Sequence, residues 1–149
     1  MPDRKYEVSA HCRFYIKYHI VWIVKRRRQL LMNKEVIRRL VEILKQIGDD
    51  NELFVEEIGC DEDHLHLFCQ AYPDIKPSTV VKLFKGISAR VLKQEFPNLV
   101  DQTYTNSLWG VGYYISTVGH KTNEEAVRKY IKQQGKHQNI KTYYQLKIF

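Results

Sequence analysis

Residues 53–72 have the sequence LFVEEIGCDEDHLHLFCQAY. Two apolar runs, Leu53–Cys60 and His64–Tyr72, flank the acidic turn Asp61–Asp63. Runs of this length separated by a short polar turn are typical of a β-hairpin. We therefore expect a pair of antiparallel strands in the middle of the chain.

A longer strand is predicted upstream, over residues 14–25. One side of it is apolar, whereas the other side is mixed and carries Lys17 and His19. The apolar positions, which recur with a period of two, are Phe14, Ile16, Tyr18, Ile20, Trp22 and Val24. Because this period places side chains on one face of a strand, that face should join the core.

Helices are expected on either side of the hairpin. The first begins after Asn33, a favourable N-cap, and Gly48 is its predicted stop. Its apolar stripe is Val36, Ile37, Leu40, Val41, Leu44 and Ile47. The second is predicted from Pro77 to about Phe96. It carries apolar residues on one side (Val80, Leu83, Phe84, Ile87 and Val91) and cations on the opposite side (Lys82, Lys85, Arg90 and Lys93).

The C-terminal third predicts a second strand pair over residues 102–118, with the turn position left open. A last helix is predicted from Thr122, which has capping-box spacing to Glu125, to about Gly135. The resulting order βαββαββα contains the ferredoxin-like (RRM-like) plan, an α+β fold with an antiparallel sheet and helices packed on one face. We expect a single domain over residues 1–149, because no linker-like segment divides the chain.

Composition restricts the function classes. The chain has 24 Lys and Arg against 17 Asp and Glu, a net charge of +7, and its densest basic cluster is Lys25–Arg28. This surplus favours polyanionic partners, although many soluble domains carry excess lysine without binding nucleic acid. No apolar run approaches the ~20 residues of a membrane span, and three cysteines argue against a disulfide framework. We expect a soluble, cytoplasmic protein without a membrane partner.

His64 and His66 form a candidate metal site. They share one face of their predicted strand, while Leu65 and Leu67 point into the core. Two strand residues advance ~6.6 Å, so both imidazoles can reach one ion of the Zn or Mn type at ~2.1 Å. An H-x-H pair taken alone is more often a pair of half-exposed histidines. Its place beside an acidic turn at a strand start favours the metal site.

Tyr130 is a candidate nucleophile on the last predicted helix, four residues before Gln134. Residues at i and i+4 share a helix face roughly 5–6 Å apart, so the helix can offer a phenol and an amide oxygen to one site. A tyrosine on an amphipathic helix is more often a packing residue, and this chain has ten tyrosines.

Five motifs occur together over about residues 12–136. They are KLFKGISAR at 82–90, LWGVGYY at 108–114, TVG at 117–119, the HLH run at 64–66 and the YIKQQ segment at 130–134. In this combination and order the sequence resembles the single-tyrosine HUH transposases, the TnpA-type enzymes of single-strand DNA insertion sequences. The resemblance implies that His64 and His66 are the metal-binding pair, Tyr130 the nucleophile and Gln134 the third metal ligand.

The resemblance also implies an activity and partners. The expected enzyme is a DNA transposase that cleaves and rejoins single-stranded DNA at insertion-sequence ends through a 5′-phosphotyrosine and a divalent metal. Two imidazoles would ordinarily suit zinc, but the family implies Mg or Mn. It also implies hairpin-ended substrates, the cytoplasm of a prokaryotic cell near the nucleoid, and a homodimer whose sites combine the histidines of one subunit with the tyrosine of the other. Candidate contacts to the DNA backbone are Lys25, Arg26, Arg27, Arg28, Lys82, Lys85, Arg90 and Lys93, for which an ordinary solvated face is an equal alternative.

Three other functions stay open. A non-catalytic nucleic-acid-binding module would stack bases on aromatic residues of the sheet, but it leaves the histidine pair and Tyr130 unexplained. A replication or mobilisation nuclease with HUH chemistry is usually larger. A host-adopted relative would cut repeated hairpins without moving an element, and the sequence does not separate it from a transposase.

Overall fold

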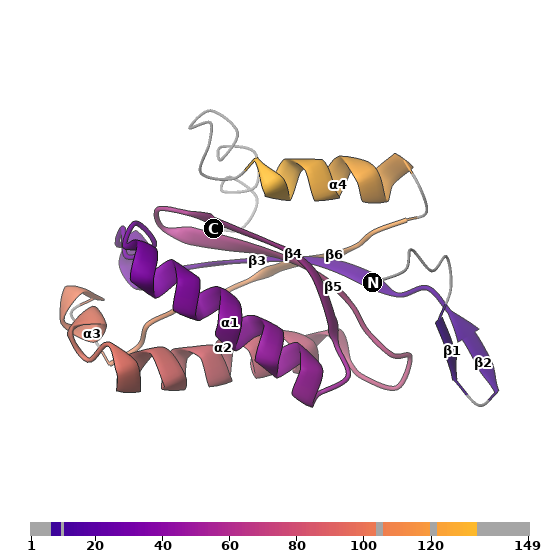
Figure 1. Ribbon diagram of the computed structural model, residues 1–149, viewed down its shortest axis with the longest axis horizontal. Coiled ribbons are helices and arrows are strands. Elements are labelled where there is room, and N and C mark those ends of the chain that lie inside the picture. Colours follow the sequence, from indigo (N-terminus) through magenta and orange to yellow (C-terminus); the bar gives the residue numbers. More distant parts are fainter. Residues whose placement is uncertain (1–6, 10, 104–105, 120–121, 134–149) are drawn as a thin grey trace.

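An antiparallel sheet with helices on both faces forms the centre of the computed structural model, which describes residues 7–9, 11–103, 106–119 and 122–133 (Figure 1). Within these residues the main sheet has four strands in the order β4-β5-β3-β6, which are Phe54–Asp61, His64–Gln70, Lys17–Ile23 and Tyr114–Thr117. Helices α1 (Lys34–Asp50) and α2 (Pro77–Glu95) lie on one face, and α4 (Thr122–Lys132) lies on the other (Figure 1). This order confirms the predicted ferredoxin-like α+β fold.

The predicted hairpin forms as β4 and β5, which pair antiparallel with Asp61 opposite His64 and Gly59 opposite His66. The register shifts between Val55 and Glu57, which marks a β-bulge. Consecutive strand residues ordinarily point to opposite faces, and the extra residue of a bulge interrupts that alternation. Glu56 and Glu57 consequently both lie on the α4 face of the sheet, where each forms ion pairs with α4.

The predicted strand over residues 14–25 is divided. Its alternation is confirmed in β3, where Tyr18, Ile20 and Trp22 join the core. The prediction of one continuous strand is wrong, because β2 (Cys12–Phe14) pairs with β1 (Glu7–Ser9) in a separate two-stranded sheet. The β3–β5 ladder ends where Lys17 meets Gln70, and one further hydrogen bond runs from the Ala71 N–H to the Ile16 carbonyl. Residues 15–16 then separate β3 from β2.

Helix α1 begins as predicted. The side-chain oxygen of Asn33 accepts hydrogen bonds from the backbone N–H groups of Glu35 and Val36. The predicted stop at Gly48 is wrong, because the helix continues to Asp50. Gly48 instead allows the backbone of Leu53 to pass close to the helix. The Leu53 N–H donates to the Gly48 carbonyl, and a Cβ added at residue 48 would lie 2.5 Å from the Leu53 carbonyl oxygen.

Helix α2 spans Pro77–Glu95 and ends before Pro97, as predicted. Its buried side is rotated from the predicted stripe. Leu83, Ile87 and Val91 are only partly buried, whereas the fully buried residues are Val80, Val81, Phe84, Ser88 and Leu92.

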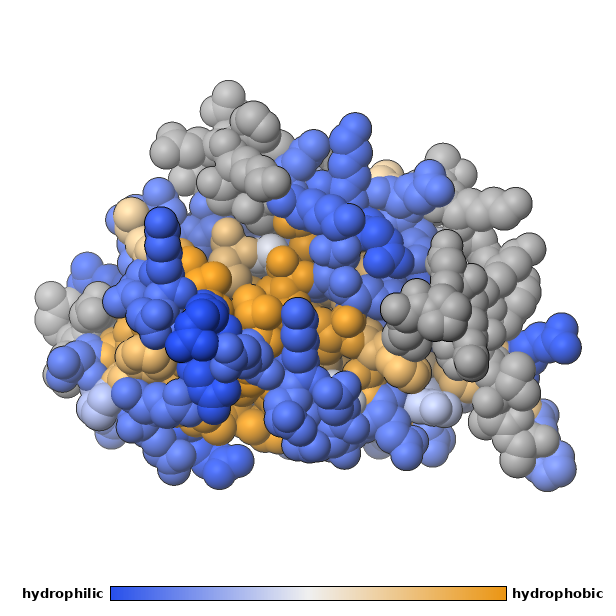
Figure 2. Space-filling model, in the orientation of Figure 1, coloured by the Kyte–Doolittle hydropathy of each residue, from blue (hydrophilic) through white to orange (hydrophobic). Residues whose placement is uncertain are grey.

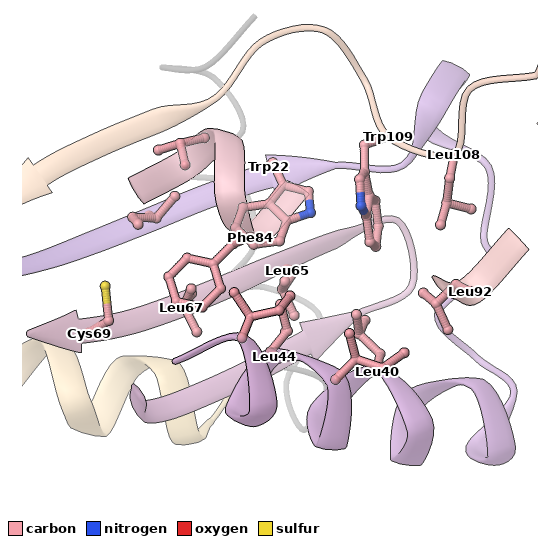
Figure 3. Packing of buried hydrophobic residues seen from close by; sticks show 14 of the residues in the cluster. Trp22, Leu40, Leu44, Leu65, Leu67, Cys69, Phe84, Leu92, Leu108 and Trp109 are labelled. Carbon is pink, nitrogen blue, oxygen red and sulfur yellow. The ribbon is translucent and has the colours of Figure 1, made fainter. Parts of the chain in front are cut away.

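The predicted strand pair over residues 102–118 is wrong. The structure has a short helix, α3 (Asn98–Thr103), and, within the described part of 106–118, one strand, β6. Trp109 lies in the core against Trp22, with ring centroids 5.8 Å apart (Figure 3). Its indole N–H donates to the buried Ser88 hydroxyl at 3.0 Å. Trp109 also forms an isolated antiparallel bridge with Val24. The described segment before β6 is therefore an irregular loop with a single bridge and not a second strand of a pair.

The main core lies between the sheet and helices α1 and α2 (Figure 3). Its contributors include Leu40 and Leu44 of α1, Leu65 and Leu67 of β5 and Phe84 of α2. Figure 2 shows hydrophobic residues gathered at the level of the sheet, between hydrophilic surfaces above and below. None of the helices in the described ranges combines the length and apolar character needed to cross a membrane.

Candidate active site

The sequence-predicted histidines lie on the sheet face that α4 covers. His64 and His66 alternate with core leucines along β5, so both point towards α4, and their ring centroids are 5.0 Å apart. Their exposed fractions are 1% and 0%. The predicted placement of the pair on one face is therefore confirmed, but the side chains are buried rather than half-exposed.

Each histidine of the pair has a hydrogen bond at Nδ1. Nδ1 of His64 lies 2.8 Å from Oδ1 of Asp63, which also accepts from Nε of Arg27 at 3.3 Å through its second oxygen. Nδ1 of His66 lies 3.0 Å from Nε2 of His19, a residue of β3 with an exposed fraction of 0%. These bonds fix the orientation of both rings. Nε2 of His64 consequently points away from Asp63, and Nε2 of His66 points away from His19.

The protonation of these residues follows from their surroundings. Burial lowers the pKa of His19 to about 4. Burial, together with the neighbouring His19 and His64, lowers the pKa of His66 well below its ordinary value. Burial alone would raise the pKa of Asp63, but its contacts with His64 and Arg27 outweigh burial and lower it. At neutral pH, His66 and His19 are therefore neutral, and a neutral imidazole is the form that binds a metal.

Helix α4 brings Tyr130 to the histidines of the same chain. The Tyr130 ring centroid lies 5.3 Å from that of His66 and 6.4 Å from that of His19. The phenol ring is half-buried and packs against a small apolar cluster of Phe68, Val118 and Ile131. The predicted third ligand, Gln134, lies outside the described residues, and α4 itself ends at Lys132.

Ion pairs connect α4 to the sheet. Lys17 of β3, with an exposed fraction of 3%, lies 2.7 Å from Glu124 and 3.0 Å from Glu56. Arg128, one turn after Glu124, lies 2.6 Å from Glu124 and 2.9 Å from Glu56. We refer to Lys17, Glu56, Glu124 and Arg128 as the α4 charge network.

Two further contacts extend the α4 charge network. Lys132 lies 3.3 Å from Glu57, and the Tyr15 hydroxyl donates to Glu124. Burial acts to raise the pKa of Glu124, but hydrogen bonds from Lys17, Tyr15 and Arg128 outweigh it and lower that pKa to about 2. Burial and the Glu124 carboxylate raise the pKa of Tyr15. Glu124 is consequently ionised throughout the physiological range.

The predicted DNA contacts occupy different environments. Lys25, Arg26 and Arg27 form the short 3-10 helix η1 (Lys25–Arg27), and Arg26, Arg27 and Arg28 are exposed. Because Arg27 pairs with Asp63, this basic cluster borders the histidine site.

The α2 cations lie across the sheet from the histidines. Lys82 and Arg90 are exposed. Lys85 and Lys93 are half-buried: the Lys85 ammonium donates to the Gly110 carbonyl at 2.6 Å, and that of Lys93 donates to the Asn106 carbonyl at 3.1 Å. Burial also lowers the pKa of Lys85.

Sequence reasoning missed His19, Asp63 and the α4 charge network as parts of this region. The alternation of β3 already placed His19 and Lys17 on the non-core side, and Asp63 directly precedes His64. The consecutive Glu56 and Glu57 also signalled a polar surface. What the sequence lacked was the register that places His19 beside His66.

Among the described residues, the candidate metal ligands are the two histidines His64 and His66. In the described ranges, no group of three or more His, Cys, Asp or Glu side chains comes together as a possible metal site. The pair nevertheless fits a metal, because metal-binding histidines characteristically hydrogen-bond a neighbouring group through their second ring nitrogen. Here Nδ1 of His64 lies within hydrogen-bond distance of Asp63, and Nδ1 of His66 lies within hydrogen-bond distance of His19. A third ligand would have to come from a residue such as Gln134.

In this site a histidine pair lies on a ferredoxin-like sheet beneath a helix that carries a tyrosine. The family described as Transposase IS200 like matches residues 12–134. The chain therefore belongs to the IS200-like transposase family, whose members are enzymes of DNA transposition.

Relatives agree with this assignment. The ISDra2 transposase TnpA of Deinococcus radiodurans is 36% identical over 121 residues, which cover 81% of this chain and 85% of that protein. The transposase for insertion sequence element IS200 of Salmonella typhimurium is 33% identical over 126 residues, covering 84% of this chain and 80% of the relative.

Solved structures share the fold. A crystal structure from Deinococcus radiodurans R1, described as that of a transposase, superimposes with a TM-score of 0.69 at 31% identity and covers 87% of this chain and 98% of its own. The REP-associated tyrosine transposase bound to a REP hairpin has a TM-score of 0.59 at 14% identity, covering 85% of this chain and 72% of its own. The second likeness concerns the fold alone.

Proposed function

We propose that this transposase cleaves and rejoins single-stranded DNA at insertion-sequence ends, with Tyr130 as the nucleophile. The observation that carries the proposal is the position of Tyr130, whose ring lies 5.3 Å from that of His66 on the helix that covers the histidine pair. The relatives named above are transposases of insertion sequences, which favours this function over a nucleic-acid-binding module.

The proposed reaction exchanges one phosphodiester bond for another. The Tyr130 phenolic oxygen attacks the phosphorus, and the bond from phosphorus to the 3′-oxygen of the upstream nucleotide breaks. That oxygen leaves as a 3′-hydroxyl with the proton that the phenol gives up. The downstream strand stays attached to Tyr130 as a 5′-phosphotyrosine. Attack by a different 3′-hydroxyl reverses the step and joins new ends, so no ATP is needed.

Divalent metal is part of the proposal. His64 and His66 would hold Mg or Mn, with Gln134 as the third ligand. The bound ion would neutralise charge on the scissile phosphate. The hydrogen bonds at both Nδ1 atoms support this role, because they orient the two rings so that Nε2, the opposite nitrogen of each ring, is the one that would bind the ion.

Single-stranded DNA with hairpin ends is the proposed substrate, and one structural neighbour is described as bound to a hairpin. The exposed Arg26, Arg28, Lys82 and Arg90 are candidates for contacts with its phosphates. Such a substrate places the enzyme with the DNA of a prokaryotic cytoplasm. We also propose a homodimer in which α4 of one subunit docks on the sheet of the other, through the contacts that the single chain makes with itself.

Tyr130→Phe tests the nucleophile. Phenylalanine keeps the ring against Phe68 and Ile131, so folding and hairpin binding should survive while cleavage becomes undetectable. With DNA labelled on the 3′ side of the cut, wild-type protein and Mg or Mn should give a labelled protein that survives denaturation, and peptide mapping should place the label on Tyr130. Tyr114, whose ring lies 6.1 Å from that of His19, is the matched control as Tyr114→Phe. An adduct on Tyr114, or cleavage without any adduct, would contradict the assignment.

His64→Ala and His66→Ala test the metal ligands. Each variant should lose divalent-dependent cleavage, by about 10²–10³-fold or more, because charge stabilisation at the phosphate is lost. Hairpin binding, measured by fluorescence anisotropy, should change little, since the exposed cations are untouched. Wild-type cleavage rates in either variant would remove the metal role from the histidine.

A further inference from the structure

We infer that His19 is a positioning residue, which accepts a hydrogen bond from Nδ1–H of His66 and so keeps Nε2 of His66 as the nitrogen that faces the metal. The part of this inference that concerns the metal rests on the proposed function. The hydrogen bond itself belongs to the metal-free protein.

The sheet register brings the two rings together. Val21 lies opposite His66 and His19 lies opposite Phe68, so His19 and His66 are diagonal neighbours on the α4 face. Nε2 of His19 is 3.0 Å from Nδ1 of His66, and the ring planes are inclined by only 21° with centroids 5.3 Å apart. Both side chains have an exposed fraction of 0%. Because bulk water does not reach this bond, it is a strong constraint on the ring of His66.

One proton lies between the two nitrogens, and its position decides what His66 can do. If His66 carries the proton on Nδ1, the Nε2 lone pair can bind a cation. If His19 carries it on Nε2, Nδ1 of His66 is the acceptor and the neutral His66 ring holds its own proton on Nε2. Only the first arrangement suits a metal ligand, and it requires His19 to act as the acceptor.

His64 offers a parallel on the same strand. Its Nδ1 is held at 2.8 Å by the Asp63 carboxylate, which can only accept when ionised. Both histidines of the pair are therefore held at the same ring nitrogen, by residues from different segments of the chain. Such second partners typically fix the tautomer and orientation of a metal ligand. Ordinary core packing of His19 would not require a hydrogen bond at this atom.

The first test reads the tautomer without metal. Full-length protein labelled with ¹⁵N-histidine, at neutral pH and treated with a chelator, should show His66 as the Nδ1–H tautomer in its imidazole ¹⁵N spectrum. In His19→Leu the His66 population should shift towards Nε2–H. Finding His66 as the Nε2–H tautomer in the wild-type protein would overturn the inference, whatever the activity.

The second test measures Mn²⁺ affinity by titration calorimetry or electron paramagnetic resonance. His19→Leu should weaken Mn²⁺ binding about 10–100-fold, the usual effect of losing such a partner. His19→Gln should recover most of the Mn²⁺ affinity, because its amide oxygen can accept a hydrogen bond from His66. If His19→Leu does not fold, the Mn²⁺ affinity of His19→Gln still tests the inference. Unchanged Mn²⁺ affinity in His19→Leu, or a His19→Gln that binds no better than His19→Leu, would overturn the inference.

Gln70→Leu is the matched control. Gln70 is a buried polar residue on the same face of β5, and its amide nitrogen has no hydrogen-bond partner among the described residues. It lies four residues from His66, about 13 Å along the strand. Its replacement should leave Mn²⁺ affinity and the His66 tautomer unchanged, and a loss as large as that of His19→Leu would overturn the inference. Wild-type protein that binds no Mn²⁺ would instead refute the proposed metal site, and with it the metal role of His19.

Discussion

Gly48 and Gly86 show how one residue type has opposite roles in two helices of this protein. Gly48 lies near the end of α1, where an added Cβ would meet the Leu53 carbonyl oxygen at 2.5 Å. Gly86 lies in the middle of α2, is exposed, and has nothing within 4 Å of an added Cβ. Intrinsic helix propensity favours alanine at both positions, so the surroundings decide the sign of the effect.

We expect Gly48→Ala to destabilise the protein by about 1–3 kcal/mol, because α1 or the start of β4 must move. Gly86→Ala should stabilise it by about 0.5–1 kcal/mol, since alanine loses less backbone freedom on folding. Urea unfolding of both variants measures the two effects, and each variant serves as the control for the other. A Gly48→Ala protein at least as stable as the wild type would show that the approach of Leu53 is not a constraint.

At this scale, part of the site was predictable from the sequence. The period of two along β5 is a local property, and it correctly placed His64 and His66 on one face. The pairing of His19 with His66 depends on the register between β3 and β5, which lie 47 residues apart at that bond. No local pattern contains that register, so His19 appeared only as one polar residue on a mixed strand face.

At the scale of elements, α4 is held by ion pairs as well as by apolar contacts. Its apolar contacts are the cluster around Phe68, Val118 and Ile131, whereas Glu124 and Arg128 both reach the sheet through ion pairs. The β-bulge at Glu56 contributes to this arrangement by placing two adjacent carboxylates under the helix. The docking of the tyrosine-bearing helix should therefore respond to conditions that leave the main core intact.

Acid should loosen α4 before the rest of the protein. The pKa of Glu124 is lowered from 4.5 to about 2, so its ionised form stabilises docking. This contribution is complete above about pH 4.5 and is lost as pH falls towards 2. NMR signals of Val127 and Ile131 should shift over that range, with α1 signals as the internal reference.

Glu124→Gln isolates the contribution of Glu124 from that of the other charged groups on this face of the sheet, Glu56 and Glu57. The variant should show weakened α4 docking already at pH 7 and little further change attributable to residue 124 below pH 4.5. Wild-type α4 signals that remain constant to pH 2.5, with α1 equally unchanged, would contradict a charge-based attachment.

The elements that sequence reasoning placed wrongly depend on distant partners. β6 pairs with β3, almost a hundred residues earlier, and Trp109 is fixed by Trp22 and Ser88. A segment rich in aromatic and β-branched residues around Gly110 and Gly112 has local strand character. Its loop conformation follows from burial of one indole and from the Lys85 ammonium that binds the carbonyls of Gly110 and Gly112.

At the scale of the whole molecule, the order of helices and strands was predictable because each main element carries its own period and boundary signals. That order leaves few topologies, and the ferredoxin-like arrangement is one that buries the apolar faces of all three layers. Whether the functional unit is one chain or two is a different matter, which the sequence addresses only through the family resemblance.

Mixed dimers test the proposed sharing of sites. A His64→Ala subunit and a Tyr130→Phe subunit are each inactive, yet a heterodimer with shared sites contains one whole site. Random mixing should then restore about a quarter of the wild-type sites, because half of the dimers are mixed and each has one working site. DNA cleavage after proven subunit exchange measures this. Persistent inactivity would show that Tyr130 works with the histidines of its own chain, as it is placed in the single-chain structure.

The charged surface under α4, formed by Lys17, Glu56 and Glu57, is the same on every copy of the chain. In the proposed homodimer, a helix that crosses to the partner subunit would therefore find contacts identical to those it leaves, and the two docked states would be equal in contact energy. Substitutions in the α4 charge network weaken both states alike and cannot bias the choice between them. In that homodimer the balance between the two docked states would be set by the connection between β6 and α4 and by the relative placement of the two sheets. A change in the length of that connection would then favour one docked state without altering any docking contact.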